Sequence, residues 1–150
     1  MSGFLFDTNI WIAIVFKKHP FHRAAQQKLE QASPSQPAVF CRSTEQSFLR
    51  LATNDRVLKF YDVAPTTNSA ALAMLHQLQA LPQVRTDDEP PGTTMLWHSL
   101  AATETPSPRV WMDAYLAAFA ISGGLQFLTA DKDFNAYQRH GLALTLVDAP

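Results

Sequence analysis

Short apolar runs and longer amphipathic stretches alternate from one end of the chain to the other. The apolar runs have the length and composition of buried strands, which predicts strands over residues 3–6, 38–41, 125–129 and 142–147. The stretches between them place apolar residues at helical spacing, which predicts helices over residues 9–16, 67–80, 94–103 and 109–121.

Two more helices are expected from their start signals. Pro20 suits the first position of a helix that ends at the break over residues 33–37. Ser43 lies three residues before Gln46, which is the spacing of a capping box, so a helix is expected to run from Ser43 to Asn54. Glu45 then falls in the first turn of that helix.

This alternation of strands and helices favours right-handed crossovers and a parallel sheet with helices on both faces. We therefore expect an α/β fold, a three-layer α/β/α sandwich with a central parallel sheet. Its 150 residues and 16.7 kDa fit a single domain over residues 1–150. The chain is 47% hydrophobic and only 17% charged, which excludes a chain disordered by its charge.

Charge and cysteine content limit the possible ligands and the cellular compartment of the protein. The net charge is -1, so any contact with nucleic acid must come from a local basic patch. Cys41 is the only cysteine, so an internal disulfide is excluded, and we read it as a buried strand residue of a cytoplasmic protein. Asp7 interrupts the first apolar run, and the longest uncharged stretch, 114–127, is too short to span a bilayer, so no signal peptide or membrane contact is expected.

Four acidic residues fall at equivalent places in this pattern. Asp7 directly follows the first predicted strand, and Asp131 follows the third after one residue. Glu45 opens the helix after the second strand, and Asp113 lies near the start of the helix that leads into the third. Because ligands bind at the carboxyl edge of an open parallel sheet, we expect these four side chains to converge on one rim.

Such a cluster is unfavourable without a cation, because neighbouring carboxylates raise one another's pKa. A ligand set made only of oxygen atoms suits Mg²⁺ or Mn²⁺ rather than zinc, and the chemistry it supports is metal-assisted phosphodiester hydrolysis. The alternative is that each acid is a turn or cap residue. Asp133 adds a fifth acid, and for it a helix cap before Phe134 is favoured over a second metal.

Basic and aromatic residues leave two choices open. Four basic residues lie on either side of Glu45 in the sequence: Arg42, Arg50, Arg56 and Lys59. They could form a phosphate-binding strip, or they could be ordinary solvated charges. The three tryptophans, Trp11, Trp97 and Trp111, could stack on bases. Their helical spacing instead favours a place in the core or in a dimer interface.

Four stretches together resemble one known family. They are residues 6–9, residues 44–51 with 54–58, residues 111–118 and residues 128–134, in that order and spread over nearly the whole chain. They resemble the PIN-domain proteins, and more narrowly the VapC toxins of type II toxin–antitoxin pairs. The resemblance implies a Mg²⁺-dependent endoribonuclease, with Mn²⁺ as a possible substitute, that acts on RNA and is held inactive by a cognate VapB-type antitoxin.

The resemblance also assigns roles to residues. The four acidic positions of the family match Asp7, Glu45, Asp113 and Asp131. It implies that Asp7 and Asp113 are the principal metal ligands, and that Glu45 and Asp131 complete the shell or position the attacking water. Two accessory polar positions of the family match Asn9 and Thr129.

Other functions remain open from the sequence alone. A related nuclease that acts on DNA, or in RNA processing without an antitoxin, would have the same acids, and a catalytically silent PIN domain could serve as a scaffold. Residues 85–104 match nothing diagnostic, so no RNA target is predicted. Apolar surface left uncovered by so small a sheet indicates a homodimer and a groove for an antitoxin peptide.

Overall fold

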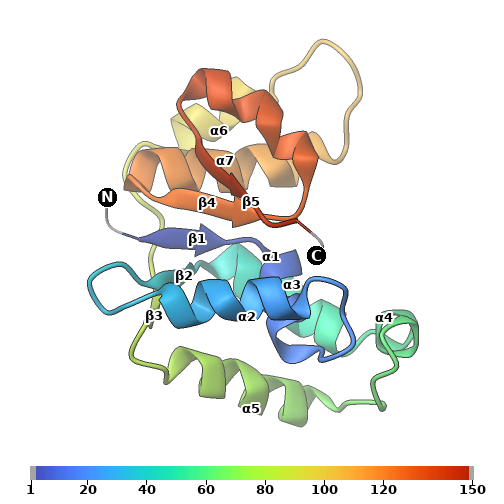
Figure 1. Cartoon of the computed structure of the whole chain (residues 1–150). Helices are drawn as coiled ribbons and strands as arrows, with labels where there is room; N and C mark the ends of the chain where they lie inside the picture. Colours follow the sequence, from blue (N-terminus) through green and yellow to red (C-terminus); the bar gives the residue numbers. More distant parts are fainter. Residues whose placement is uncertain (1–2, 149–150) are drawn as a thin grey trace.

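A five-stranded sheet with only parallel neighbours forms the centre of the computed structural model, which describes residues 3–148 (Figure 1). The strand order is β3-β2-β1-β4-β5. The strands are β1 Phe4–Phe6, β2 Ala38–Phe40, β3 Val84–Thr86, β4 Gln126–Thr129 and β5 Ala143–Leu146.

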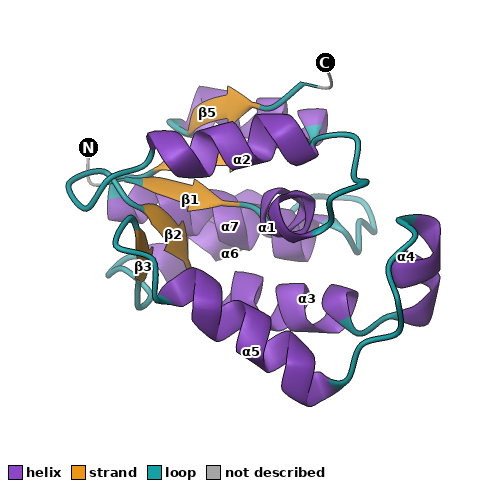
Figure 2. Ribbon diagram, turned by 60° about the horizontal axis from the view of Figure 1, so that its bottom comes forward, coloured by secondary structure: helices purple, strands orange, loops and turns teal. Residues whose placement is uncertain are grey.

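Helices cover both faces of this sheet (Figure 2). One face packs against α1 Thr8–Val15, α2 His22–Gln31, α3 Arg42–Ala52 and α5 Asn68–Gln79. The other face packs against α6 Thr93–Ala101, α7 Val110–Gly123 and the 3₁₀ helix η1 Lys132–His140. A short helix, α4 Asp55–Phe60, follows α3. The predicted three-layer α/β/α sandwich is therefore confirmed.

Strand periodicity divides the core into two clusters. Successive residues of a strand point to opposite faces, so Phe6 joins the core under α1 while Leu5 joins the core under α7. Trp11 is fully buried and stacks on Phe40 with 3.8 Å between the ring centroids. Of the three tryptophans, Trp11 thus lies in the core, whereas Trp111 is 54% exposed.

Two elements were not expected from the sequence. Strand β3 has three residues, of which only Val84 is buried, so it lacks the apolar run that marks the other strands. Helix α4 has six residues and is capped by Asn54, whose Oδ1 accepts from the amides of Arg56 and Val57. Asn54 therefore begins the next helix, and α3 ends before it.

Three predicted helix signals are corrected. The N-cap of α2 is Phe21, so Pro20 precedes the helix and does not occupy its first turn. The N-cap of α3 is Cys41 rather than Ser43, and the Cys41 amide donates to Thr44 Oγ1 at 3.0 Å. Cys41 is buried as expected, but it follows β2 instead of belonging to it.

A glycine marks the end of α7. Gly124 ends α7 in the left-handed conformation expected of a glycine C-cap. No helix within residues 3–148 combines the length and the apolar character that crossing a membrane requires.

Candidate active site

Three aspartates line one cavity of about 390 Å³ at the carboxyl ends of β1 and β4. The strands are in register, with Phe6 beside Leu128, so the residues that follow them emerge at the same edge. Asp7 comes from the end of β1, Asp131 from the turn after β4, and Asp113 from the first turn of α7. The cavity therefore collects carboxylates from three separate segments of the chain.

Asp7 is the most buried of the three, at 8% exposed. It is the N-cap of α1, and its Oδ1 accepts from the Thr8 amide at 2.8 Å. Its Oδ2 accepts from Thr129 Oγ1 at 2.7 Å. Burial raises the pKa of Asp7 to about 6, and the charges of Asp113 and Asp131 add to this, although the hydrogen bonds from Thr129 and Thr8 oppose it.

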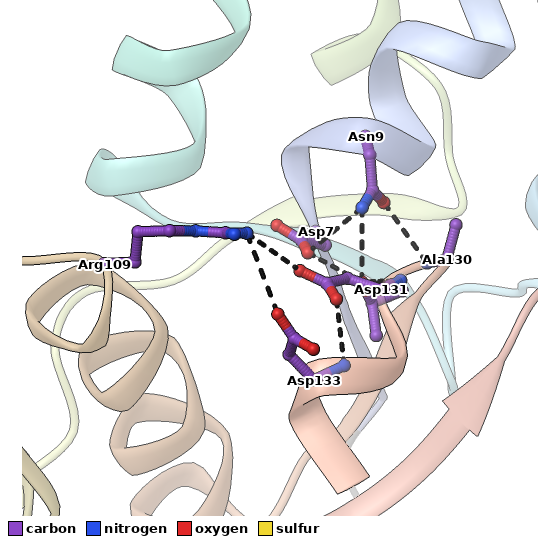
Figure 3. Close-up of polar contacts among 7 residues, drawn as sticks. Asp7, Asn9, Arg109, Ala130, Asp131 and Asp133 are labelled. Atoms are coloured by element: carbon purple, nitrogen blue, oxygen red, sulfur yellow. Dashed lines mark hydrogen bonds and ion pairs between the residues drawn. The ribbon is translucent and has the colours of Figure 1, made fainter. Parts of the chain in front are cut away.

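A small hydrogen-bond network fixes the orientation of Asp7 (Figure 3). Asn9 Nδ2 donates to Asp7 Oδ2 at 3.4 Å and to Thr129 Oγ1 at 3.3 Å. Thr129 Oγ1 also accepts from the Asp131 amide at 3.0 Å, and Asn9 Oδ1 accepts from the Ala130 amide at 3.4 Å. The two accessory polar residues thus tie the ends of β1 and β4 together around one carboxylate.

Asp131 has a structural contact besides its place in the cavity. Its Oδ1 caps η1 by accepting from the Asp133 amide at 2.9 Å. The predicted cap role of Asp133 is therefore wrong: Asp131 is the N-cap, and Asp133 is 68% exposed in the first turn. Arg109 Nη2 lies 3.8 Å from Oδ2 of both aspartates.

Asp113 lies among these charges in a half-buried position. Burial raises its pKa, and the carboxylates of Asp131 and Asp133 add to the effect while Arg109 opposes it. The pKa is thus raised at both Asp7 and Asp113, first by burial and then by the carboxylates around them.

Glu45 lies in the first turn of α3, as predicted, but it is not among the residues that line this cavity. Its Oε2 accepts from Gln79 Nε2 at 2.8 Å. Its Oε1 makes no hydrogen bond and lies 3.2 Å from Arg42 Nη1. The structure therefore brings together three of the four predicted acids and gives the fourth its own partners.

The three cavity aspartates suit a hard divalent cation. Among the described residues, no group of three or more His, Cys, Asp or Glu side chains is arranged so that together they could hold a metal ion. Mg²⁺ does not require one, because it keeps several waters and takes one or two carboxylates from the protein. An oxygen-only set with a raised pKa at its most buried member, Asp7, fits that kind of ion.

Two contributors to the site were not predicted. They are Arg109, which lies near Asp131 and Asp133, and Gln79, which donates to Glu45. Of the basic residues proposed as a strip, Arg50 lines the cavity and Arg42 pairs with Glu45, while Arg56 and Lys59 are exposed on α4. No sequence signal marks a glutamine on α5 as the partner of a glutamate on α3.

The sheet order and the acidic edge agree with a match to a known family. The model of the PIN domain matches residues 4–140 of this chain. The chain therefore belongs to the PIN-domain family, as its motifs predicted.

Curated relatives narrow the family to its VapC group. Ribonuclease VapC41 of Mycobacterium tuberculosis is 42% identical over 134 residues, which cover 89% of this chain and 92% of that protein. Ribonuclease VapC31 of the same organism is 29% identical over 132 residues, covering 87% and 90%. Ribonucleases of this group generally depend on a divalent metal ion.

Solved structures with the same fold are more distant in sequence. VapBC2 from Rickettsia felis, bound to a DNA fragment from their promoter, contains a chain with a TM-score of 0.62 and 14% identity, covering 97% of this chain and 98% of that one. VapC20 of Mycobacterium tuberculosis, a Sarcin-Ricin loop cleaving toxin, has a TM-score of 0.61 and 18% identity, covering 99% and 100%. At these identities the likeness concerns the fold.

Proposed function

We propose that this chain is a Mg²⁺-dependent endoribonuclease, with Mn²⁺ as a substitute, and the toxin of a VapBC-type toxin–antitoxin pair. The observation that carries the proposal is the shared cavity of Asp7, Asp113 and Asp131 in a chain so similar to VapC ribonucleases. Carboxylates in one cavity with raised pKa values favour a bound divalent cation, and hydrolysis of a phosphodiester is the chemistry that such an ion supports.

Each acid has a role in this proposal. Asp7 and Asp113 hold the ion, and Asp131 completes its shell or positions the attacking water. When bound, the ion activates water and stabilises the charge that develops on the phosphate. Glu45 lies outside the cavity, so we assign it the outer role of orienting water molecules at the rim.

Accessory residues act through these acids. Thr129 donates to Asp7 Oδ2 and Asn9 bridges both residues, so together they hold one carboxylate rotamer. Hydrogen bonds of this kind to a metal ligand preserve both its orientation and its basicity. We regard Thr129 and Asn9 as positioning residues.

The proposed partners follow from the same reading. A cognate VapB-type antitoxin neutralises the toxin in the cytoplasm, and two copies of the chain form a homodimer. VapBC2 of Rickettsia felis is itself a toxin–antitoxin assembly with this fold. Large apolar side chains are exposed and available for such contacts: Phe60, Leu72, Met95, Trp111 and Met112.

A cleavage assay on matched substrates tests the proposal. Purified chain is incubated with RNA and DNA oligonucleotides of the same sequence, in Mg²⁺, in Mn²⁺ and in excess EDTA. We expect cleavage of RNA in either metal and none in EDTA. Full activity in EDTA contradicts the metal site, and cleavage of DNA alone replaces the ribonuclease with a DNA nuclease. Toxicity on expression that a neighbouring small open reading frame relieves would separate a toxin from an RNA-processing enzyme.

A further inference from the structure

Arg109 reaches from the start of α7 toward the acidic rim formed by Asp131 and Asp133 (Figure 3). Its side chain is 80% exposed, and its Nη2 is 3.8 Å from each Oδ2. That distance is too long for a hydrogen bond, so the contacts are purely electrostatic. A solvated pair of this kind contributes about 0–1 kcal/mol, so the guanidinium is free to exchange partners.

We propose that Arg109 is a phosphate-binding residue of this site: it screens the acidic rim when no metal is bound and moves to an RNA phosphate once a divalent ion has taken its place. The inference rests on the proposed function. It concerns how the RNA substrate is bound. The four family acids do not provide that binding, because carboxylates repel the phosphate group.

Charge balance supports the exchange. Arg109 faces two carboxylates at equal distance and also lowers the pKa of Asp113, so its charge acts on two of the three cavity aspartates. A divalent ion bound to these carboxylates removes the attraction and repels the guanidinium. A phosphodiester held at the metal then becomes the nearest uncompensated anion, and the planar fork of arginine matches it in bidentate fashion.

Three other arginines are placed differently. Arg42 lies against Glu45 outside the cavity, and Arg85 makes a bidentate pair with Asp87. Arg50 also lines the cavity, but the ion pairs with Asp131 and Asp133 are formed by Arg109.

The test measures two affinities that should change in opposite directions in Arg109→Gln. Calorimetric titration with Mn²⁺ reports the competition: loss of the screening charge should lower the Kd for Mn²⁺ by up to about five-fold, the size of an exposed ion pair. Fluorescence anisotropy with a labelled single-stranded RNA in Ca²⁺, with intact RNA verified on a gel, reports phosphate binding. Its Kd should rise about ten-fold, as for the loss of a charged hydrogen bond.

Two further variants make the result specific. Arg23→Gln on α2 removes the same charge from an exposed position far along the chain and should leave both affinities unchanged. Arg109→Lys keeps the charge without the fork and should bind RNA with an intermediate affinity. The salt dependence of RNA binding should also become shallower by about 0.7 in log–log slope for Arg109→Gln, because one phosphate contact is lost.

Weaker RNA binding with unchanged Mn²⁺ affinity would overturn the proposed exchange, because it shows no competition between Arg109 and the metal. Tighter Mn²⁺ binding together with weaker RNA binding supports the proposal. Unchanged RNA binding, or weaker binding of both Mn²⁺ and RNA, overturns it, since the first leaves no phosphate contact and the second indicates a structural ion pair. A wild-type chain that binds Mn²⁺ but cleaves no RNA contradicts the proposed function instead, so the two failures are distinguishable.

Discussion

Asp7 and Glu45 are almost equally buried, at 8% and 9% exposed, yet the chain treats their charges in opposite ways. Burial raises the pKa of Asp7 to about 6, and the charges of two further carboxylates, Asp113 and Asp131, add to this. Glu45 faces a guanidinium and an amide, from Arg42 and Gln79. Burial alone therefore does not distinguish the two carboxylates, whereas the charges beside them differ in sign. Glu45 has a cationic partner within the chain, whereas at Asp7 we propose that a bound metal ion supplies the positive charge.

The largest effect expected from this difference is on catalysis. Asp7→Asn should reduce metal-dependent RNA cleavage by more than about 100-fold, since replacing even an outer partner of a metal ligand costs about 10–100-fold. Glu45→Gln should cost about ten-fold, at the lower end of that range, because its role is outside the cavity. Initial rates with saturating Mg²⁺ measure both, and thermal unfolding checks that each variant folds. Equal losses of activity in the two variants would contradict the different roles proposed for Asp7 and Glu45.

The second effect is on the stability of the metal-free protein. A carboxyl group whose pKa rises from 3.8 unfolded to about 6 folded binds its proton more tightly in the native state. Stability should therefore fall as pH rises from about 4 to 6, by up to about 3 kcal/mol, and stay low above that range. Denaturant unfolding in EDTA at several pH values measures it.

Asp7→Asn is the control for this pH dependence. It should remove most of the slope between pH 4 and 6 and make the metal-free protein more stable at pH 8. Glu45→Gln should leave the slope in place. A metal-free Asp7→Asn protein that unfolds more easily at pH 8 would mean that Asp7 serves the fold as a cap of α1 more than it serves the site.

The smallest effect separates positioning from ligation. Thr129→Val removes the donor to Asp7 Oδ2 with little change in volume, and we expect metal affinity to fall by about 10-fold, within the range for outer partners. Thr145→Val on the neighbouring strand β5 is the matched control, since its hydroxyl bonds to Gln126 instead. Calorimetry measures the Mn²⁺ affinity of both variants. Identical affinities would show that Thr129 does not position the metal ligand.

Sequence patterns predicted the strands that are marked by continuous apolar runs. Asp7 and Asp131 could be placed at the edge because each follows a recognisable buried strand, Asp7 directly and Asp131 after one residue, and parallel strands end together. Strand β3 was not predicted because it has a single buried residue and is held in the sheet by its pairing with β2. Tertiary pairing of this sort leaves no periodicity in the sequence.

The different contacts of the acidic residues could not be predicted from the sequence for a related reason. Glu45 was correctly placed in the first turn of its helix, but the contact with Gln79 joins residues 34 positions apart. Likewise, the cap role expected of Asp133 belongs to Asp131 two residues earlier. Local spacing identifies a candidate cap or ligand, whereas the packing of helices decides which side chain receives which partner.

Titration of Mn²⁺ into the metal-free chain tests most directly whether the aspartate cavity awaits a cation. We expect wild-type protein to bind Mn²⁺, Glu45→Gln to retain that binding, and Asp7→Asn to lose it. Mn²⁺ binding that survives in Asp7→Asn, or that vanishes in Glu45→Gln alone, would contradict the assignment of the metal to Asp7 and its neighbours.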